Sequence, residues 1–470
     1  MTPLRFPDGF AWGVATASYQ NEGAVREDGR SPSIWDTFAD TSGKIVDGKT
    51  GEVACDHYHR YAEDVDLLAD LGVTHYRFSL AWPRLQPDGR SGLNAAGVDF
   101  YSRLIEALLE RGIQPWVTLY HWDLPQVLED AGGWPERDTA SRFAEYAAAV
   151  HARLHDRVQI WTTLNEPWCS SMLGYAAGEQ APGLQDPGLA LRAAHHLLLG
   201  HGLAIDAMRP QDDNSRFGIT LNLKHISAAS EDPKDADAAR RIDLIANRMF
   251  LDPVLRGTYP PDFVDHVSRL TDPSYIQPGD ENVMHAPLDA LGINYYFGRV
   301  ARAGQRPAGP WPWVGCDDVE FVPKDLPRTQ AGWEIDPDGL HEVLVRVAGE
   351  YPDAPPLYVT ENGATFDDQA PTGDGVVDDP QRIAYLDDHF RAARRAIADG
   401  VDLRGYFVWT LMDNFEWKFG YTRTFGLYHV DFENQRRTPK ASARWFAEVT
   451  RANGIYAPSV ARVPKKPTKS

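Results

Sequence analysis

The sequence predicts an α/β fold in which eight parallel strands close into a barrel surrounded by helices, a (β/α)8 TIM barrel. Two observations predict it. Eight short runs are almost continuously apolar, as strands buried on both faces are. Segments with helical periodicity separate these runs. Eight such units favour a closed barrel over an open, doubly wound sheet.

The apolar runs are spread over almost the whole chain. In chain order they are residues 10–18, 73–82, 114–122, 160–166, 217–223, 288–296, 357–361 and 403–412. The mean unit is about 56 residues long, whereas a bare barrel of about 250 residues needs only about 31 per unit. We therefore expect long loops, notably between the first and second, fifth and sixth, and sixth and seventh runs.

Helical periodicity is clearest in three segments. Apolar side chains recur at helical spacing in residues 61–71 and 101–108, and Gly112 ends the second pattern. Residues 382–399 behave in the same way and end at Gly400. No Ser/Gly-rich linker divides the chain, so we expect one barrel domain over residues 1–463. Residues 464–470 contain three lysines and are expected to form a flexible tail.

The composition is that of an average globular protein, because 43% of the 470 residues are hydrophobic and 24% are charged. This excludes collagen-like, disordered and small disulfide-stabilised classes. The formal net charge is −20, so phosphate backbones and anionic lipids repel the chain. We therefore expect no nucleic-acid or membrane partner, and the oligomeric state stays open.

Three cysteines, Cys55, Cys169 and Cys316, are too few and too scattered for a disulfide framework or a zinc site. No signal peptide is visible at the N-terminus, and no run has the ~18 to 20 apolar residues of a membrane span. We expect a cytoplasmic protein in a reducing compartment, without a metal or a cofactor.

Polar side chains gather where the predicted strands end. In order they are Gln20, Arg77, His121-Trp122-Asp123, Asn165-Glu166-Pro167, Asn222, Asn294, Tyr296, Glu361-Asn362-Gly363, Trp409 and residues 413–417. Each alone has an ordinary explanation, such as a solvated turn, a structural ion pair or a core histidine. Together they predict a pocket at the carboxyl end of the barrel, where barrel enzymes place their chemistry.

The contents of this pocket suit a sugar, because amide, imidazole and carboxyl groups bind hydroxyls while tryptophans pack on pyranose faces. Two carboxyls suit cleavage of a glycosidic bond. We expect Glu361 to be the nucleophile, kept ionised by Arg77 through a lowered pKa. Glu166, with no cation nearby in its strand, is the expected acid. Carboxyls about 5–5.5 Å apart would indicate retention, and about 6.5–9.5 Å inversion.

From end to end the chain resembles the β-glucosidases of glycoside hydrolase family 1. The motifs that carry the resemblance are residues 6–10, 13–20, 54–58, 76–79 and 121–126, Thr163-Leu164-Asn165-Glu166-Pro167, residues 292–296, Thr360-Glu361-Asn362-Gly363 and residues 411–417. The resemblance implies a retaining two-step mechanism, with Glu166 as acid/base and Glu361 as nucleophile. It also implies hydrolysis of terminal β-glucosyl residues of short β-glucosides and cello-oligosaccharides, with galactoside and fucoside side activity.

The resemblance also assigns the other site residues. Asn294 and Tyr296 would orient the nucleophile beside Arg77, while Trp168 and Trp333 would line the aglycone side. The residues expected to bind the sugar are Gln20, His121, Trp122, Asn165, Asn222, Trp409, Glu416, Trp417 and Phe425.

Two alternatives are weighed against this function. A non-catalytic sugar-binding member of the fold would lack one glutamate, yet Glu166 and Glu361 are both present. A 6-phospho-β-glycosidase of this family would carry serine in place of Glu416, whose charge we expect to repel a phosphate. Lys418 and Thr424 depart from the pattern expected of relatives, which leaves the aglycone preference open.

Three other motifs favour structural roles. Residues 43–50 match the P-loop pattern, but no apolar strand precedes them and no helix follows directly, so we expect a solvated loop. Residues 55–59 lack the ligand spacing of known zinc sites. His195, His196 and His201 are expected to be core or surface histidines.

Overall fold

The computed structural model describes residues 3–368, 371 and 375–456. Within them, eight parallel strands form a closed barrel with the hydrogen-bonded order β11-β12-β2-β3-β4-β5-β6-β8. The strands are β2 (Ala11–Ala15), β3 (His75–Ser79), β4 (Gln114–Tyr120), β5 (Ile160–Asn165), β6 (Arg216–Asn222), β8 (Ala290–Asn294), β11 (Leu357–Asn362) and β12 (Leu403–Trp409). Each overlaps one of the eight apolar runs, so the predicted barrel is confirmed. The expected tail, 464–470, lies outside the described residues.

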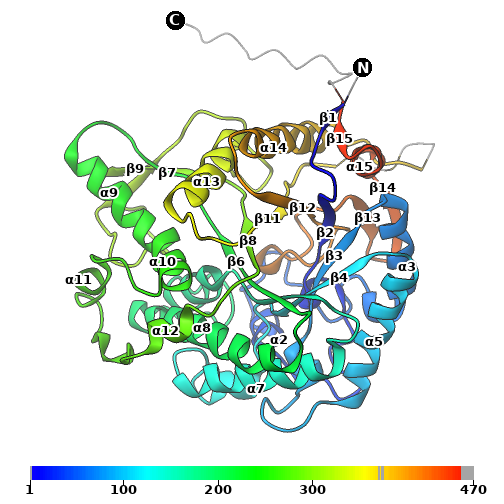
Figure 1. Ribbon diagram of the computed structural model, residues 1–470, viewed down its shortest axis with the longest axis horizontal. Helices are drawn as coiled ribbons and strands as arrows, with labels where there is room; N and C mark the ends of the chain where they lie inside the picture. The colour runs from blue at the N-terminus through cyan, green and yellow to red at the C-terminus, as the bar shows by residue number, and fades with distance from the viewer. Residues whose placement is uncertain (1–2, 369–370, 372–374, 457–470) are drawn as a thin grey trace, which may run out of the picture.

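Helices surround the barrel (Figure 1). The longest are α3 (His57–Leu71), α5 (Ala95–Glu110), α7 (Arg137–Leu154), α8 (Pro187–Met208), α13 (Pro337–Glu350), α14 (Pro380–Ala398) and α15 (Ala441–Ala452). The three segments predicted from periodicity are α3, α5 and α14. Gly72 ends α3 with a φ of 65°, a left-handed conformation that glycine adopts without strain. Among the described residues no helix has the length and apolar character needed to cross a membrane.

The surplus length lies in the loops where it was expected. The β2–β3 connection holds α1 (Ser18–Asn21) and α2 (Ile34–Asp40), and the β6–β8 connection holds β7 (Ile226–Ala228), α9 (Pro233–Asp243), α10 (Met249–Arg256), α11 (Phe263–Val267) and α12 (Asp280–Met284). The β8–β11 connection contributes β9 (Arg299–Ala303) and β10 (Val319–Val322), which join β7 in a small sheet. Shorter helical pieces include α4 (Trp82–Leu85), α6 (Gln126–Asp130), the π-helical η1 (Cys169–Ala176) and η3 (Leu244–Arg248).

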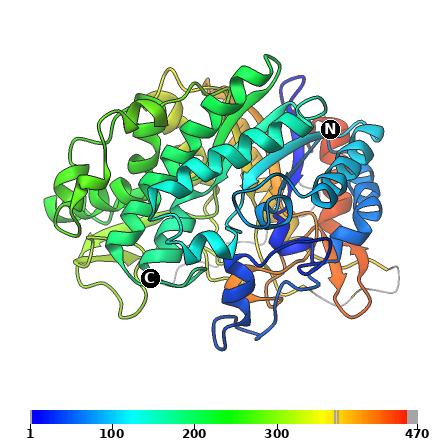
Figure 2. The ribbon, with the colours of Figure 1, turned by 90° about the horizontal axis from the view of Figure 1, so that it is seen from below.

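Like the small sheet of β7, β9 and β10, two further short antiparallel pairs were not predicted. β1 (Leu4–Arg5) pairs with β15 (Gly454–Ile455), and β13 (Tyr428–Asp431) pairs with β14 (Arg436–Pro439). They are too short to show the continuous apolar pattern of a barrel strand. The β2–β3 loop lies beside the loop after β12, blue and orange at the lower right of Figure 2, and Val46 N–H donates to the Lys418 carbonyl over 2.8 Å.

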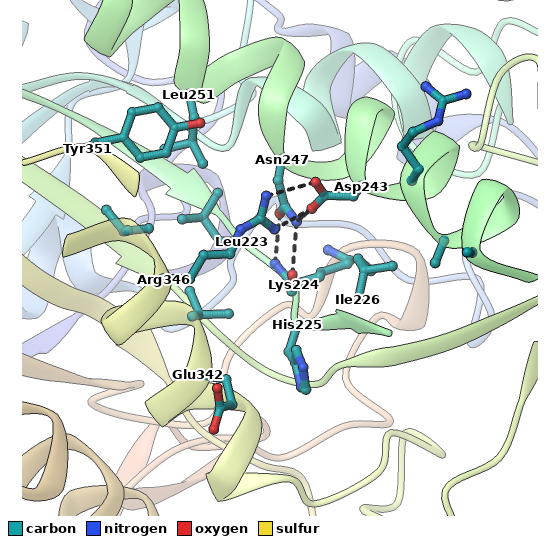
Figure 3. Close-up of a pocket in the computed structure, with 15 residues that line it drawn as sticks. Leu223, Lys224, His225, Ile226, Asp243, Asn247, Leu251, Glu342, Arg346 and Tyr351 are labelled. Atoms are coloured by element: carbon teal, nitrogen blue, oxygen red, sulfur yellow. Dashed lines mark hydrogen bonds and ion pairs between the residues drawn. The ribbon is translucent and has the colours of Figure 1, made fainter. Parts of the chain in front are cut away.

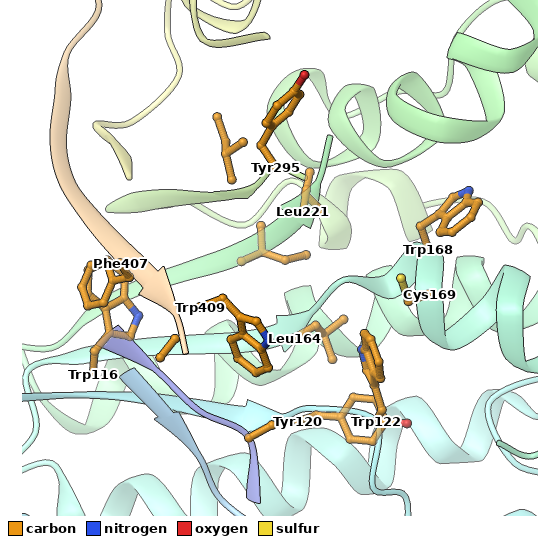
Figure 4. Packing of buried hydrophobic residues seen from close by; sticks show 14 of the residues in the cluster. Trp116, Tyr120, Trp122, Leu164, Trp168, Cys169, Leu221, Tyr295, Phe407 and Trp409 are labelled. Carbon is orange, nitrogen blue, oxygen red and sulfur yellow. The ribbon is translucent and has the colours of Figure 1, made fainter. Parts of the chain in front are cut away.

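The interior of the barrel is filled at its amino end. The Trp116 ring packs edge-on against Phe407 at 5.1 Å and against Tyr358 at 4.9 Å between centroids. A Cβ on Gly13 would lie 2.4 Å from the Phe407 ring, so this strand position has no room for a side chain. Figure 4 shows Phe407 and Trp116 together and Trp409 further along β12, at the strand end. The amino end of the barrel interior therefore has no room for a ligand.

Candidate active site

Glu361 lies on β11 and is 3% exposed. Arg77, from β3, donates through Nη1 to Glu361 Oε1 over 2.6 Å. The Tyr296 hydroxyl donates to the other carboxyl oxygen over 2.9 Å. Donors from β3 and from the segment after β8 therefore hold the two oxygens, which fixes the carboxyl group at the strand ends. The predicted contacts of Arg77 and Tyr296 with this glutamate are present.

Burial raises the pKa of Glu361 to about 7, against the lowering effect of Arg77, and the neighbouring Glu166 carboxyl raises it further. The sequence-based expectation of a lowered pKa was wrong in its net direction. Burying a carboxylate away from water costs more than one guanidinium and one hydroxyl recover. The group is thus poised to ionise near neutral pH.

Glu166 follows β5 and is 5% exposed. Asn294 donates through Nδ2 to Glu166 Oε1 over 2.7 Å, and the Cys169 thiol donates to Oε2 over 3.0 Å. We expected Asn294 to orient the nucleophile, but its amide contacts the acid/base candidate instead. Glu166 has a φ of 48°, a left-handed value that is unfavourable for a residue with a side chain and is typical of functional sites.

One amide links the surroundings of the two carboxyls. Asn165 Oδ1 accepts from Arg77 Nη2 over 2.7 Å and from Asn294 Nδ2 over 3.1 Å. Arg77 also holds Glu361, and Asn294 also holds Glu166. Three hydrogen-bonded side chains therefore link the two carboxyls, which are close enough for Glu166 to raise the pKa of Glu361. Acid-assisted nucleophilic displacement requires two such neighbouring carboxyls.

Several buried polar atoms of the site, among them His121 Nδ1 and Gln20 Oε1, have no partner among the described residues. His121 Nε2 accepts from Asn165 Nδ2 over 3.0 Å, which leaves Nδ1 as an unused donor. Gln20 Nε2 donates to the Phe415 carbonyl over 2.9 Å and to Glu416 over 3.2 Å, while its Oε1 is unused. Buried polar groups are normally paired. An unpaired donor and an unpaired acceptor in one pocket fit a ligand rich in hydroxyls.

Burial raises the pKa of Glu416 to about 8, and the carboxyls Glu361 and Glu166 add to this against the amide of Gln20. At neutral pH the group is mostly protonated and can donate a hydrogen bond. The repulsion of a phosphate that we expected from its charge is correspondingly weaker.

Aromatic rings form the walls of the pocket. Trp417 lies 4.5 Å from Trp122 and 5.9 Å from His121 between ring centroids, and Trp409 lies 5.8 Å from His121. Trp122 and Trp417 have φ values of 78° and 48°, so their backbones are held in the left-handed region. The Trp122 indole N–H donates to the Asn165 carbonyl over 3.0 Å, which fixes one wall to the carboxyl network. Figure 4 shows Trp409 and Trp122 turned toward the same space.

The chain matches glycosyl hydrolase family 1 over residues 2–455. It belongs to this family.

Relatives match over nearly the whole chain. A bifunctional β-D-glucosidase/β-D-fucosidase of Bifidobacterium breve is 50% identical over 456 residues, which are 94% of this chain and 97% of the relative. β-Glucosidase A of Thermotoga maritima is 44% identical over 97% of this chain and 100% of its own.

Solved structures of the family agree closely with this one. The crystal structure of a psychrophilic β-glucosidase from Micrococcus antarcticus has a TM-score of 0.93 at 49% identity, covering 97% of this chain and 100% of its own. A Thermotoga maritima β-glucosidase in complex with castanospermine has a TM-score of 0.91 at 43% identity, covering 96% of this chain and 100% of its own.

Trp168, which we expected on the aglycone side, follows Glu166 in the segment after β5. Trp168 lies 5.1 Å from Trp313 between ring centroids, and Figure 4 shows Trp168 and Cys169 on the segment after β5. Asn222 donates to the Cys169 sulfur over 3.5 Å, so this predicted residue lies beside the acid/base candidate.

Trp333, the other residue expected on the aglycone side, belongs to a second group of rings. Trp333 packs on Tyr296 at 5.3 Å and on Phe425 at 5.9 Å between centroids. Phe425 lies 6.2 Å from Tyr296. The two predicted aromatics, Trp333 and Phe425, are thus connected to the nucleophile through the tyrosine that holds it.

Four residues that contact predicted site residues were not themselves predicted. Cys169 contacts Glu166, Lys224 and Trp313 contact Trp168, and Phe297 contacts Trp333. Cys169 and Lys224 each follow a predicted site residue closely in sequence, at Glu166 plus three and Asn222 plus two. Their closeness in sequence to Glu166 and Asn222 is the one feature that could have predicted Cys169 and Lys224 as neighbours of the site. Trp313 lies in a long loop where no periodicity points to its partner.

The two departures from the expected family pattern lie in loops after β12. Lys418 forms an ion pair with Glu179, and the Thr424 hydroxyl donates to the Phe366 carbonyl over 3.0 Å. Both contacts join the β12 loop to segments that follow other strands.

The motifs assigned structural roles have contacts within the protein. Residues 43–50 form turns after α2 with no strand before them, and Asp47 accepts from the Tyr421 N–H over 2.8 Å. The Cys55 thiol donates to the Asp413 carbonyl over 3.1 Å, and His57 Nδ1 lies 2.8 Å from the Asp64 carboxylate. The three histidines of α8 are buried, each with a hydrogen bond to Asp280, the Trp134 carbonyl or Thr163.

Proposed function

We propose that the protein is a retaining β-glucosidase that releases terminal, non-reducing β-D-glucosyl residues from short β-glucosides and cello-oligosaccharides. The observation that carries the proposal is the pair of carboxyls, Glu361 held by Arg77 and Tyr296, and Glu166 held by Asn294 and Cys169, joined through Asn165. Family membership supports the same chemistry.

In the first step, ionised Glu361 attacks the anomeric carbon, and its oxygen forms a covalent ester with the sugar. The bond between the anomeric carbon and the aglycone oxygen breaks, and its electron pair stays on that oxygen. Glu166 donates its proton to the same oxygen, so the aglycone leaves as a neutral alcohol or phenol.

In the second step, Glu166 takes a proton from water, and the water oxygen attacks the anomeric carbon. The ester bond to Glu361 breaks, and the carboxylate returns to its contacts with Arg77 and Tyr296. Two inversions restore the β configuration of the product. Water is the co-reactant of the second step, and with it both steps balance.

The pocket supports recognition of a hexose. Gln20, His121 and Glu416 provide both donors and acceptors, and Trp409 and Trp417 provide flat walls. We include β-galactosides and β-fucosides as side substrates, since the Bifidobacterium breve relative is named for both glucosidase and fucosidase activity.

The three cysteines are buried and unpaired. This suits a reducing compartment, and we propose that the enzyme works in the cytoplasm on cello-oligosaccharides that arise from cellulose degradation.

A panel of p-nitrophenyl β-glycosides tests the function, with glucose, galactose, fucose, xylose and glucose 6-phosphate as the sugars. We expect the highest kcat/KM for glucose and, by NMR, β-glucose as the first product anomer. A preference for the 6-phosphate would support the phospho-glycosidase instead. Binding without turnover of any sugar would support the non-catalytic alternative.

A further inference from the structure

The side chain of Lys224 is an unusual buried cation. It follows β6, is 9% exposed, and its Nζ lies over the Trp168 ring at 4.7 Å and near the Phe297 ring at 5.5 Å from the centroids. It makes no hydrogen bond and no ion pair through Nζ with any residue of the described segments. Burial lowers the pKa of Lys224, while Cys169 and Glu166 act against this.

Besides Lys224, six lysine and arginine residues in the described part of the chain are less than 10% exposed, and each has a carboxylate partner within ion-pair distance. The six pairs are Arg30–Asp36, Arg77–Glu361, Arg84–Glu22, Arg382–Asp368, Arg437–Asp64 and Lys440–Asp413. Burying an unpaired charge costs several kcal/mol. The exception at Lys224 therefore calls for a partner that arrives with the substrate.

The backbone of Lys224 is fixed by its neighbours. Its N–H donates to Asn247 Oδ1 over 2.9 Å, and Asn247 Nδ2 donates back to its carbonyl over 2.9 Å. Asn247 also donates to Asp243, which pairs with Arg346, as the dashed lines in Figure 3 show. This network lines a cavity of about 480 Å³ behind β6. The lysine backbone lies against the cavity, and the ammonium group is held on the Trp168 side.

A second cation lies next to Lys224. Arg299, at the start of β9, places its Cζ 4.2 Å from the Phe297 centroid, and its buried Nε has no partner among the described residues. Burial lowers the pKa of Arg299 to about 10, although Glu334 opposes this effect. The charge of Arg299 in turn lowers the pKa of Lys224. Two cations thus flank one ring, and within the described residues neither side chain forms an ion pair.

We propose that Lys224, supported by Arg299, forms a subsite for a negatively charged aglycone, so that the enzyme favours β-glucosides whose aglycone carries a carboxylate. The proposal rests on the proposed function, because it concerns the leaving group of that reaction. Trp168 connects the acid/base candidate with the proposed subsite. It follows Glu166 by two residues in the sequence, and the Lys224 ammonium lies over its ring. An aglycone that contacts Trp168 would lie close enough to Nζ for its carboxylate to pair with the ammonium group.

The net charge of −20 is unfavourable for binding an anion anywhere on the protein. The chain as a whole repels anions at long range, so a preference for an anionic aglycone has to come from local contacts. A charge-assisted hydrogen bond in a partly desolvated site is about twice as strong as a neutral one.

The test compares 4-carboxyphenyl and 4-carbamoylphenyl β-D-glucoside, which have similar shapes but different charge. The measured quantity is the ratio of their kcat/KM values, so differences in enzyme concentration cancel. We expect K224M to lower this ratio about tenfold, as loss of one charge-assisted contact would, and R299M to lower it less. The matched control is K234M on exposed α9, with a ratio equal to that of the wild type.

An unchanged ratio in K224M overturns the proposal. K224Q serves if K224M does not fold, and the wild-type enzyme gives a reading that needs no variant. Inhibition of p-nitrophenyl β-glucoside hydrolysis by 4-hydroxybenzoate must be stronger than inhibition by 4-hydroxybenzamide, and equal inhibition overturns the proposal. If the wild type does not hydrolyse p-nitrophenyl β-glucoside at all, the proposed function itself fails instead.

Discussion

The Tyr296 hydroxyl donates to Glu361 Oε2 over 2.9 Å, on the carboxyl oxygen that Arg77 leaves free. The tyrosine stabilises the ionised carboxylate, while burial favours its protonated form. The ionisation state of the nucleophile is therefore set by a balance in which one hydroxyl has a measurable share.

Removing this hydroxyl, in Y296F, should reduce activity at the acid end of the pH range. The pKa of Glu361, raised to about 7 by burial, rises further when a donor that lowers it is removed. Activity needs the ionised form, so it is present above this pKa and is lost as the pH falls through it. We expect the acid limb of kcat/KM to move to higher pH in Y296F and to stay in place in Y456F, an exposed control. A limb at lower pH in Y296F would contradict the assigned role of the hydroxyl.

Removing the nucleophile, in E361A, should reduce kcat on all glucosides by about 10⁴-fold or more, since no other carboxyl occupies its position. Azide or formate should restore part of the activity on activated aryl glucosides, because a small anion fits the space left by the carboxylate. Azide should yield the α-glucosyl azide, the product of a single inversion, detectable by NMR. A β-configured azide from E361A would contradict the role of Glu361.

Removing the acid, in E166A, should affect substrates according to their leaving groups. Hydrolysis of cellobiose needs a proton on the departing oxygen, whereas p-nitrophenolate leaves without one. We expect kcat/KM to fall by about 10²–10⁴-fold for cellobiose and much less for the first step with p-nitrophenyl glucoside. Equal losses on both substrates would show that Glu166 is not the acid.

Glu416 should act in its protonated form, so its contribution should be lost as the pH rises, whereas that of Glu361 is lost as the pH falls. Its pKa is raised to about 8 by burial, so its carboxyl donates a hydrogen bond below that pH and loses its proton above it. E416Q keeps a neutral donor at every pH. The advantage of the wild type over E416Q in kcat/KM should therefore shrink as the pH rises through about 8. An advantage that grows with pH would show that the ionised carboxylate binds the sugar.

The eight barrel strands were predictable because each is buried on both faces and therefore reads as a continuous apolar run. Strands β9 and β10 were not, because most of their residues are partly exposed and so give no continuous apolar run. The strand ends also predicted which polar residues meet, since parallel strands bring their carboxyl ends to one edge.

Partners within the site were harder to predict. Asn294 was placed correctly at the site but assigned to Glu361 rather than Glu166, because strand periodicity gives the face of a residue and not the direction of its amide. The pKa of Glu361 was misjudged for a related reason, since Arg77 is visible in the sequence and the extent of burial is not. The sequence could not predict that Lys224 lacks an ion-pair partner, because only the folded chain shows which carboxylates lie near its ammonium group.

The last prediction concerns the closed amino end of the barrel. A Cβ on Gly13 would lie 2.4 Å from the Phe407 ring and 2.9 Å from the His75 carbonyl. The ring is packed on Trp116 and cannot easily move, so G13A should destabilise the fold by about 1–3 kcal/mol, as overpacking of a core does. Thermal unfolding followed by circular dichroism measures the change. G92A is the matched control, because its Cβ would meet nothing within 4 Å, and its melting temperature should stay close to that of the wild type. The double variant G13A/F407L, which removes part of the clashing ring, should recover part of the lost stability. A G13A protein as stable as G92A would contradict the prediction and would mean that the Phe407 ring can move aside.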